Sequence, residues 1–98
     1  MPDTAASVYQ ELIEAIIRKQ ASVLGMGVAV RRAKNVQGIE VNDQGEVTKI
    51  TGGELKILSD LAEQFKALSG AIGLGFCREA AAGFALTHPG IKLPPIFL

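Results

Sequence analysis

The chain has 98 residues, of which 48% are hydrophobic, and its ten basic and ten acidic residues give a formal net charge of zero. This composition excludes an intrinsically disordered chain, because disorder requires low hydrophobicity and high net charge. A net charge of zero offers no overall attraction to nucleic acid or to an anionic membrane, so we expect neither as a partner. The length fits a single domain, residues 1–98, with one hydrophobic core.

The chain contains a single cysteine, Cys77, which has no partner for an internal disulfide. Small secreted domains usually carry an even number of cysteines, so a reducing cytoplasm is the expected location. The most apolar window, residues 67–86, has about the length of a membrane span. It contains four glycines and the adjacent charges of Arg78 and Glu79, which argue against a membrane-spanning helix.

The N-terminal region predicts an amphipathic helix that ends before Gly25. Its apolar residues recur with the 3.6-residue period of an α-helix, and glycine is common just after the end of a helix. The members of this stripe are Val8, Tyr9, Leu12, Ile13, Ile16 and Ile17.

Residues 26–51 change to a period of two, which is typical of β-strands. Val28 and Val30 alternate with Ala29 and Arg31, and further short alternating runs follow around residues 39–41 and 47. We therefore expect a three-stranded antiparallel meander, with a first turn at Lys34-Asn35 and a second at Asp43-Gln44-Gly45.

The register of the meander can be tested from the sequence. A three-residue second loop with Gly45 in the left-handed conformation sets Val41 against Val47 and Ile39 against Lys49. A two-residue first turn sets Val30 against Ile39. Both choices place the same four valines and one isoleucine on one face of the sheet. A register shift of one residue in either hairpin would distribute them over both faces. This predicted core face consists of Val28, Val30, Ile39, Val41 and Val47.

The C-terminal half predicts two helices and an extended tail. Leu58, Leu61 and Phe65 belong to a helical stripe that ends at Ser69-Gly70, and a second helix rich in small residues runs from about Phe76 to Leu86. Residues 71–75 can be helix, loop or strand, and the tail from Ile91 contains Pro94-Pro95. The expected fold class is α+β, with an N-terminal helix, a three-stranded meander, two C-terminal helices and a proline-containing tail.

The segment 70–78, G-A-I-G-L-G-F-C-R, is the sharpest local motif. Glycines before a helix can expose backbone N–H groups to an anion, and Arg78 beside Cys77 would favour a thiolate. Gly73, Gly75, Cys77 and Arg78 are therefore candidate residues of a site for an anion or a nucleotide. The spacing differs from the dinucleotide and P-loop fingerprints, and the ordinary interpretation is an interhelical turn with a buried cysteine.

No combination of residues predicts catalysis, a metal site or a cofactor. His88 follows Cys77 by eleven residues along a helix, roughly 15 Å, so the two cannot form a nucleophile–base pair within that helix. One cysteine and one histidine are too few ligands for zinc. A thiol enzyme based on Cys77 is only the third hypothesis, and the sequence favours a protein that is not an enzyme.

The second face of the predicted meander is mostly small or apolar, which is unusual for a face exposed to water. We expect it, together with the apolar end of the tail, to bind a second copy of the chain or a protein partner. The leading hypothesis is a homodimeric, non-catalytic interaction or regulatory module, and the alternative is a small-ligand sensor that uses the 70–78 segment. The predicted interface residues are Ala29, Arg31, Ala33, Val36, Ile96 and Phe97.

Overall fold

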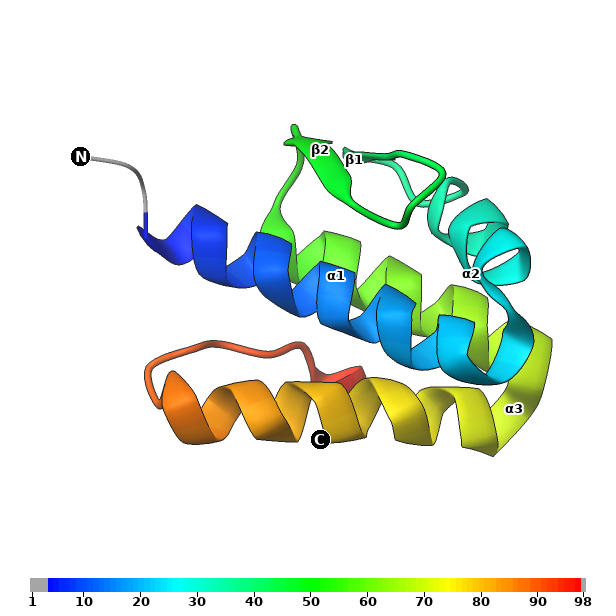
Figure 1. Cartoon of the computed structure of the whole chain (residues 1–98). Helices are drawn as coiled ribbons and strands as arrows, with labels where there is room; N and C mark the ends of the chain where they lie inside the picture. The colour runs from blue at the N-terminus through cyan, green and yellow to red at the C-terminus, as the bar shows by residue number, and fades with distance from the viewer. Residues whose placement is uncertain (1–3, 98) are drawn as a thin grey trace.

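The computed structural model describes residues 4–97, which form three α-helices, one two-stranded hairpin and a short 3-10 helix. Helix α2 and the hairpin lie over one side of α1, and the last part of α3 lies on the other side (Figure 1). Most of the buried hydrophobic side chains belong to α1 and α3. The elements are α1 (Thr4–Leu24), α2 (Met26–Ala33), β1 (Ile39–Val41), β2 (Val47–Ile50), α3 (Glu54–Thr87) and η1 (Pro95–Phe97).

Helix α1 confirms the first predicted helix and its end. Leu12, Ile13, Ile16 and Ile17 have no exposed surface, as their helical spacing predicts. The helix ends before Gly25, whose φ of 89° lies in the region that favours glycine. A sharp change of direction at this glycine leads directly into α2 (Figure 1).

The predicted three-stranded meander is wrong, because its first strand is helix α2. Ala29, Val30 and Ala33 are buried at helical spacing, whereas Val28 is 38% exposed. The alternation of Val28 and Val30 is too short to distinguish a strand from a helix that buries Ala29, Val30 and Ala33. Lys34 continues the helical pattern by donating its N–H to the carbonyl of Val30, so no hairpin turn forms at Lys34-Asn35.

The second predicted hairpin is confirmed as the only sheet among the described residues. Gly45 has φ 79°, and Val41 pairs with Val47, as a three-residue loop requires. An irregularity between Glu40 and Val41 then shifts the register, so Ile39 faces Ile50 instead of the predicted Lys49. The fold is therefore mostly helical, with two strands instead of three.

Side chains of α1 hold the hairpin at its second strand. Gln10 Nε2 donates to the carbonyl of Val47 at 2.8 Å, and the N–H of Val47 donates to Glu14 Oε2 at 2.8 Å. These bonds satisfy backbone groups at the beginning of β2 that a two-stranded sheet leaves without a strand partner. They also fix the orientation of the hairpin relative to α1.

Helix α3 replaces the two separate C-terminal helices that the sequence predicts. It consists of two helical arms joined at one non-helical residue, Gly70, at φ 62° and ψ −140°. Residues 71–75, left open by the sequence, are helical. We call residues 54–69 the N-terminal arm and residues 71–87 the C-terminal arm; the two arms run in opposite directions (Figure 1).

Gly73 allows the C-terminal arm to fold back closely on the N-terminal arm. A Cβ atom at position 73 would overlap the backbone carbonyl of Phe65, eight residues earlier. Only glycine fits such an approach between two backbones without moving one of them. Gly70 supplies the change of direction and Gly73 supplies the space, so this pair defines the bend.

The tail packs on its own chain along the C-terminal arm. Phe97 in η1 is 6% exposed, and Arg78 Nε donates to the carbonyl of Ile96 at 3.2 Å. At the other end, the Tyr9 hydroxyl donates to the carbonyl of Lys92 at 2.8 Å and accepts from its N–H at 3.2 Å. The tail is thus attached to α1 and to α3 at separate points.

The bend predicts a strong effect of adding one methyl group. We expect Gly73→Ala to lower the free energy of unfolding by about 1–3 kcal/mol, the usual cost of overpacking, because the Phe65 carbonyl cannot move without disturbing the N-terminal arm. Gly27→Ala is the matched control, since Gly27 lies in α2 with nothing near its Cβ position, and it should stabilise by roughly 0.5–1 kcal/mol. Urea unfolding of both variants measures the difference. Equal stabilities would contradict the role of Gly73.

Candidate functional site

Most of the predicted interface residues lie inside the fold. Ala29 and Ala33 have no exposed surface, and Val36 and Phe97 are 4% and 6% exposed. The meander face to which Ala29, Ala33 and Val36 were assigned does not exist, because residues 26–33 are helical. All three side chains belong to the buried core. Arg31 is exposed at the end of α2, and Ile96 is half-buried in the tail.

The predicted ligand residues Gly73, Gly75, Cys77 and Arg78 lie within the helical C-terminal arm, not in a loop before a helix. Gly73 and Cys77 face the core, whereas Arg78 is exposed on another side of the helix. The structure therefore does not gather these residues around a common cavity. Gly73 serves the close packing of the arm, whereas nothing lies within 4 Å of a Cβ atom built at Gly75.

Cys77 lies in an environment that suppresses thiol chemistry. The side chain has no exposed surface, and Gln20 Nε2 donates to the Gly73 carbonyl at 2.8 Å and lies 3.6 Å from Cys77 Sγ. Burial raises the pKa of the Cys77 thiol to about 11, from an ordinary value of 9.0, although the hydrogen bond from Gln20 acts in the opposite direction. A nucleophilic cysteine needs a lowered pKa and access to solvent.

Gln20 is the only buried polar side chain in the described core, and it joins α1 to the C-terminal arm of α3. Its Oε1 atom is buried without a hydrogen-bond partner. The amide donates to the Gly73 carbonyl, three residues after the non-helical Gly70. This contact sets which side of the arm faces inward.

The basic residues of the N-terminal half do not form one open phosphate-binding surface. Lys34 pairs with Asp43 at 2.9 Å, and the Lys19 ammonium lies 5.9 Å from the centre of the Phe76 ring. Arg31 and Arg32 are adjacent in the last turn of α2.

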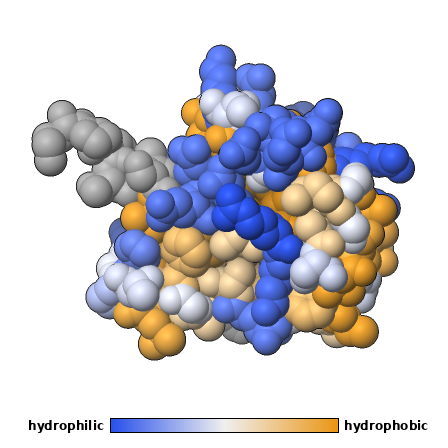
Figure 2. All heavy atoms as spheres, viewed as in Figure 1, coloured by the Kyte–Doolittle hydropathy of each residue, from blue (hydrophilic) through white to orange (hydrophobic). Residues whose placement is uncertain are grey.

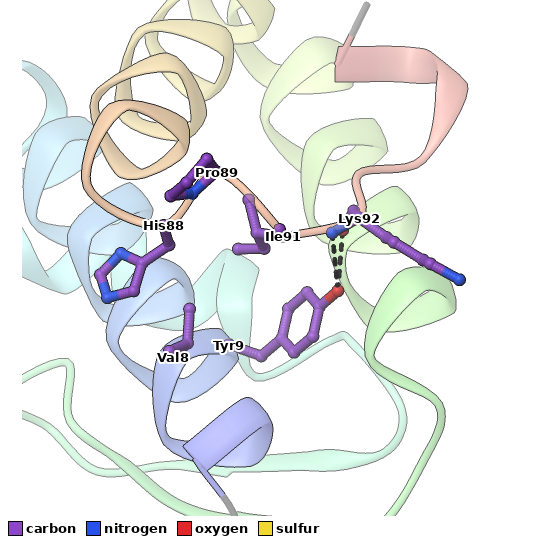
Figure 3. A pocket seen from close by; sticks show the side chains of 7 residues that line it. Val8, Tyr9, His88, Pro89, Ile91 and Lys92 are labelled. Atoms are coloured by element: carbon purple, nitrogen blue, oxygen red, sulfur yellow. Dashed lines mark hydrogen bonds between the residues drawn. The ribbon is translucent and has the colours of Figure 1, made fainter.

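A hollow of about 430 Å³ lies between the beginning of α1 and the loop that follows α3 (Figure 3). Apolar side chains of Val8, Tyr9 and Ile91 form much of its wall, and the Lys92 side chain points away from it (Figure 3). His88 stacks on Phe84 with ring centroids 5.5 Å apart. None of the predicted ligand residues lines this hollow.

The outward side of the C-terminal arm carries an unusual surface. Ile72 is 67% exposed and Leu86 is 86% exposed, and both are large hydrophobic residues. At 100° of rotation per residue, Ile72 and Leu86 lie within the same arc of about 80° of the helix circumference. Three residues that lie between them in the sequence fall within this arc as well. We call this set the outer stripe; it consists of Ile72, Gly75, Glu79, Gly83 and Leu86.

The outer stripe lies opposite the buried side of the arm, which contains Gly73, Cys77 and Ala81. A helix on a protein surface normally presents charged and polar residues to water, but Glu79 is the only charged residue of the stripe. Figure 2 shows hydrophobic groups at both ends of the lower edge of the molecule, where the C-terminal arm runs, with paler and hydrophilic groups between them.

The sequence contains the signal for this stripe, although the predicted interface missed it. The spacing of Gly73, Cys77 and Ala81 already marks one side of the arm for close packing. Extending the helix back to residue 71 places Ile72 in line with Leu86 on the opposite side. The undecided structure of residues 71–75 concealed this alignment.

Comparisons of the chain with protein-family models, with curated proteins and with solved structures found no match. Among residues 4–97, no group of three or more acidic, histidine or cysteine side chains could hold a metal ion. Within the same residues, no helix is long and apolar enough to cross a membrane. The outer stripe is the candidate functional surface, because Ile72 and Leu86 are the most exposed large hydrophobic residues among those that the structure describes.

The buried thiol gives a prediction on reactivity and pH. Because the pKa of Cys77 is raised from 9.0 to about 11, the thiolate fraction at pH 8 should fall roughly 100-fold on folding. Iodoacetamide should therefore alkylate the native chain at least about 100-fold more slowly than the chain in guanidinium. The folded chain also holds the thiol proton more tightly than the unfolded chain does. The free energy of unfolding should therefore keep this contribution below pH 9 and lose it as the pH rises towards 11. Equal alkylation rates would contradict this environment.

Proposed function

We propose that this chain is a non-catalytic interaction module that associates with a second copy of itself through the outer stripe. The observation that carries the proposal is the exposure of Ile72 and Leu86, at 67% and 86%, on one side of a helix that has a single charged residue, Glu79. Exposed apolar surface of this kind is typical of protein interaction sites. The expected homodimer is kept, but its surface differs from the one that the sequence predicts.

The chemistry of the stripe favours association over solvation. Full burial of an isoleucine or leucine side chain contributes about 1.5–3 kcal/mol, and a two-fold dimer buries each residue twice. Gly75 and Gly83 carry no side chain and therefore permit two helices to approach closely. The formal net charge of zero means that two copies do not repel each other through their overall charge.

The proposal includes a reducing cytoplasm as the location, which the single buried Cys77 supports. It does not include the anion or nucleotide sensor, because the 70–78 segment forms a bend and a packed helix instead of a phosphate-binding loop. It also does not use Cys77 in catalysis, since the thiol is inaccessible and its pKa is raised.

Polar substitutions in the stripe test the proposal. We expect sedimentation velocity to show a dimer, and we expect Ile72→Ser or Leu86→Ser to raise the dimer dissociation constant by at least about 100-fold, since each dimer loses two buried side chains. Both residues are exposed in the single chain, so the thermal midpoint of a dilute sample should change little.

Leu55→Ser is the matched control, because Leu55 is also an exposed large hydrophobic residue, at 41%, but lies on the N-terminal arm. It should leave the dissociation constant unchanged. A wild-type chain that stays monomeric at every concentration would overturn the proposal. A dimer that Ile72→Ser and Leu86→Ser do not weaken would also overturn it, because the interface would then lie elsewhere.

A further inference from the structure

We infer that two copies pair through antiparallel C-terminal arms, with the two-fold axis passing beside Glu79. This inference rests on the proposed self-association and specifies its geometry. In a two-fold interface, a residue that contacts a second residue on the other copy is matched by the reverse contact. A helix that pairs with itself in antiparallel orientation therefore needs a pattern that reads alike in both directions from the axis.

The outer stripe has this symmetry about Glu79. Its members follow one another at spacings of three, four, four and three residues, so Ile72 and Leu86 both lie seven residues from Glu79. In the antiparallel pair, Ile72 meets Leu86 of the second copy, and Gly75 meets Gly83. Large apolar residues thus meet at both ends, and glycines meet nearer the axis.

A parallel pairing fits the same residues less well. It would place Ile72 against Ile72, Arg78 against Arg78 and each helix end against its own equivalent. The antiparallel pairing instead opposes the helix dipoles, whose parallel alignment is unfavourable. It also places the positive end of each arm near the negative end of the other.

Arg78 compensates for the repulsion between the two Glu79 carboxylates that meet at the axis. Arg78 is exposed and precedes Glu79, and its Nε atom donates to the carbonyl of Ile96, which holds the base of the guanidinium group. In the pair, the remaining guanidinium nitrogens of each Arg78 reach the Glu79 of the other copy. The two reciprocal ion pairs give the interface its charge complementarity.

Disulfide cross-linking tests this geometry. Helices 8–10 Å apart bring facing Cα atoms to roughly 3.5–5.5 Å, which overlaps the 4.4–6.8 Å range of a disulfide. Glu79→Cys lies at the axis and should cross-link to its own equivalent on mild oxidation. Ile72→Cys should not, because the two copies of residue 72 lie about 21 Å apart along the antiparallel helices. A mixture of Ile72→Cys and Leu86→Cys chains should form the mixed disulfide.

The wild-type chain is the control for the native thiol, since Cys77 is fully buried and should not cross-link. If the chain dimerises but Ile72→Cys cross-links to itself, the arms are parallel and the inference is wrong, although the proposed self-association stands. If the chain dimerises and none of these variants cross-links, the inference is also wrong. If the chain is monomeric at all concentrations, both the inference and the proposed function fail.

The charges at the axis give an independent prediction. Arg78→Glu would place four carboxylates around the axis, and we expect the dimer dissociation constant to rise by at least about tenfold, because like charges across an interface are unfavourable. The double variant Arg78→Glu with Glu79→Arg should restore dimerisation by exchanging the partners. An Arg78→Glu chain that dimerises as tightly as the wild type, measured by sedimentation equilibrium, would contradict these ion pairs.

Discussion

The close approach of two backbones at Gly73 is the constraint on which the rest of this structure depends. Gly70, with its positive φ, turns the chain, and Gly73 lets the C-terminal arm of α3 pack against the carbonyl of Phe65. Once the arm has returned, small residues at Cys77 and Ala81 continue the close contact along its inner side. Because the inner side is fixed in this way, the opposite side, with Ile72 and Leu86, must face outward.

Gln20 reinforces the same arrangement from α1. Its amide donates to the Gly73 carbonyl, and the adjacent Cys77 thiol is buried with a raised pKa. A buried amide that keeps one unpartnered oxygen carries a cost in stability. The hydrogen bond it makes lies three residues after the bend at Gly70 and joins α1 to the C-terminal arm.

The sequence predicts those parts of the fold that depend on long periodic patterns or on one specific turn. The stripe of α1 and the hairpin loop with Gly45 were predictable for these reasons. Helix α2 was not, because Val28 and Val30 fit a strand while Ala29, Val30 and Ala33 fit a helix, and eight residues are too few to separate the two periods. Tertiary packing against α1 and α3 decides between them.

The same ambiguity explains the misplaced interface. Small residues such as Ala29 and Ala33 can mark a surface that awaits a partner or a place where helices pack closely, and here they mark the second. The outer stripe could be recognised only after residues 71–75 were known to be helical, because Ile72 then shares a side with Glu79 and Leu86. Sequence patterns identify which residues lie on one side, but the bend determines which side is buried.

The most direct measurement of the central claim is an isotope-filtered nuclear Overhauser experiment on a mixture of methyl-labelled and unlabelled chains. Within one chain, Ile72 and Leu86 lie about 21 Å apart along the helix, so a cross-peak between their methyl groups can arise only between two copies. The proposed pairing predicts this intermolecular cross-peak. Its absence at concentrations where the chain is dimeric, or a cross-peak between Ile72 and its own equivalent, would contradict the pairing.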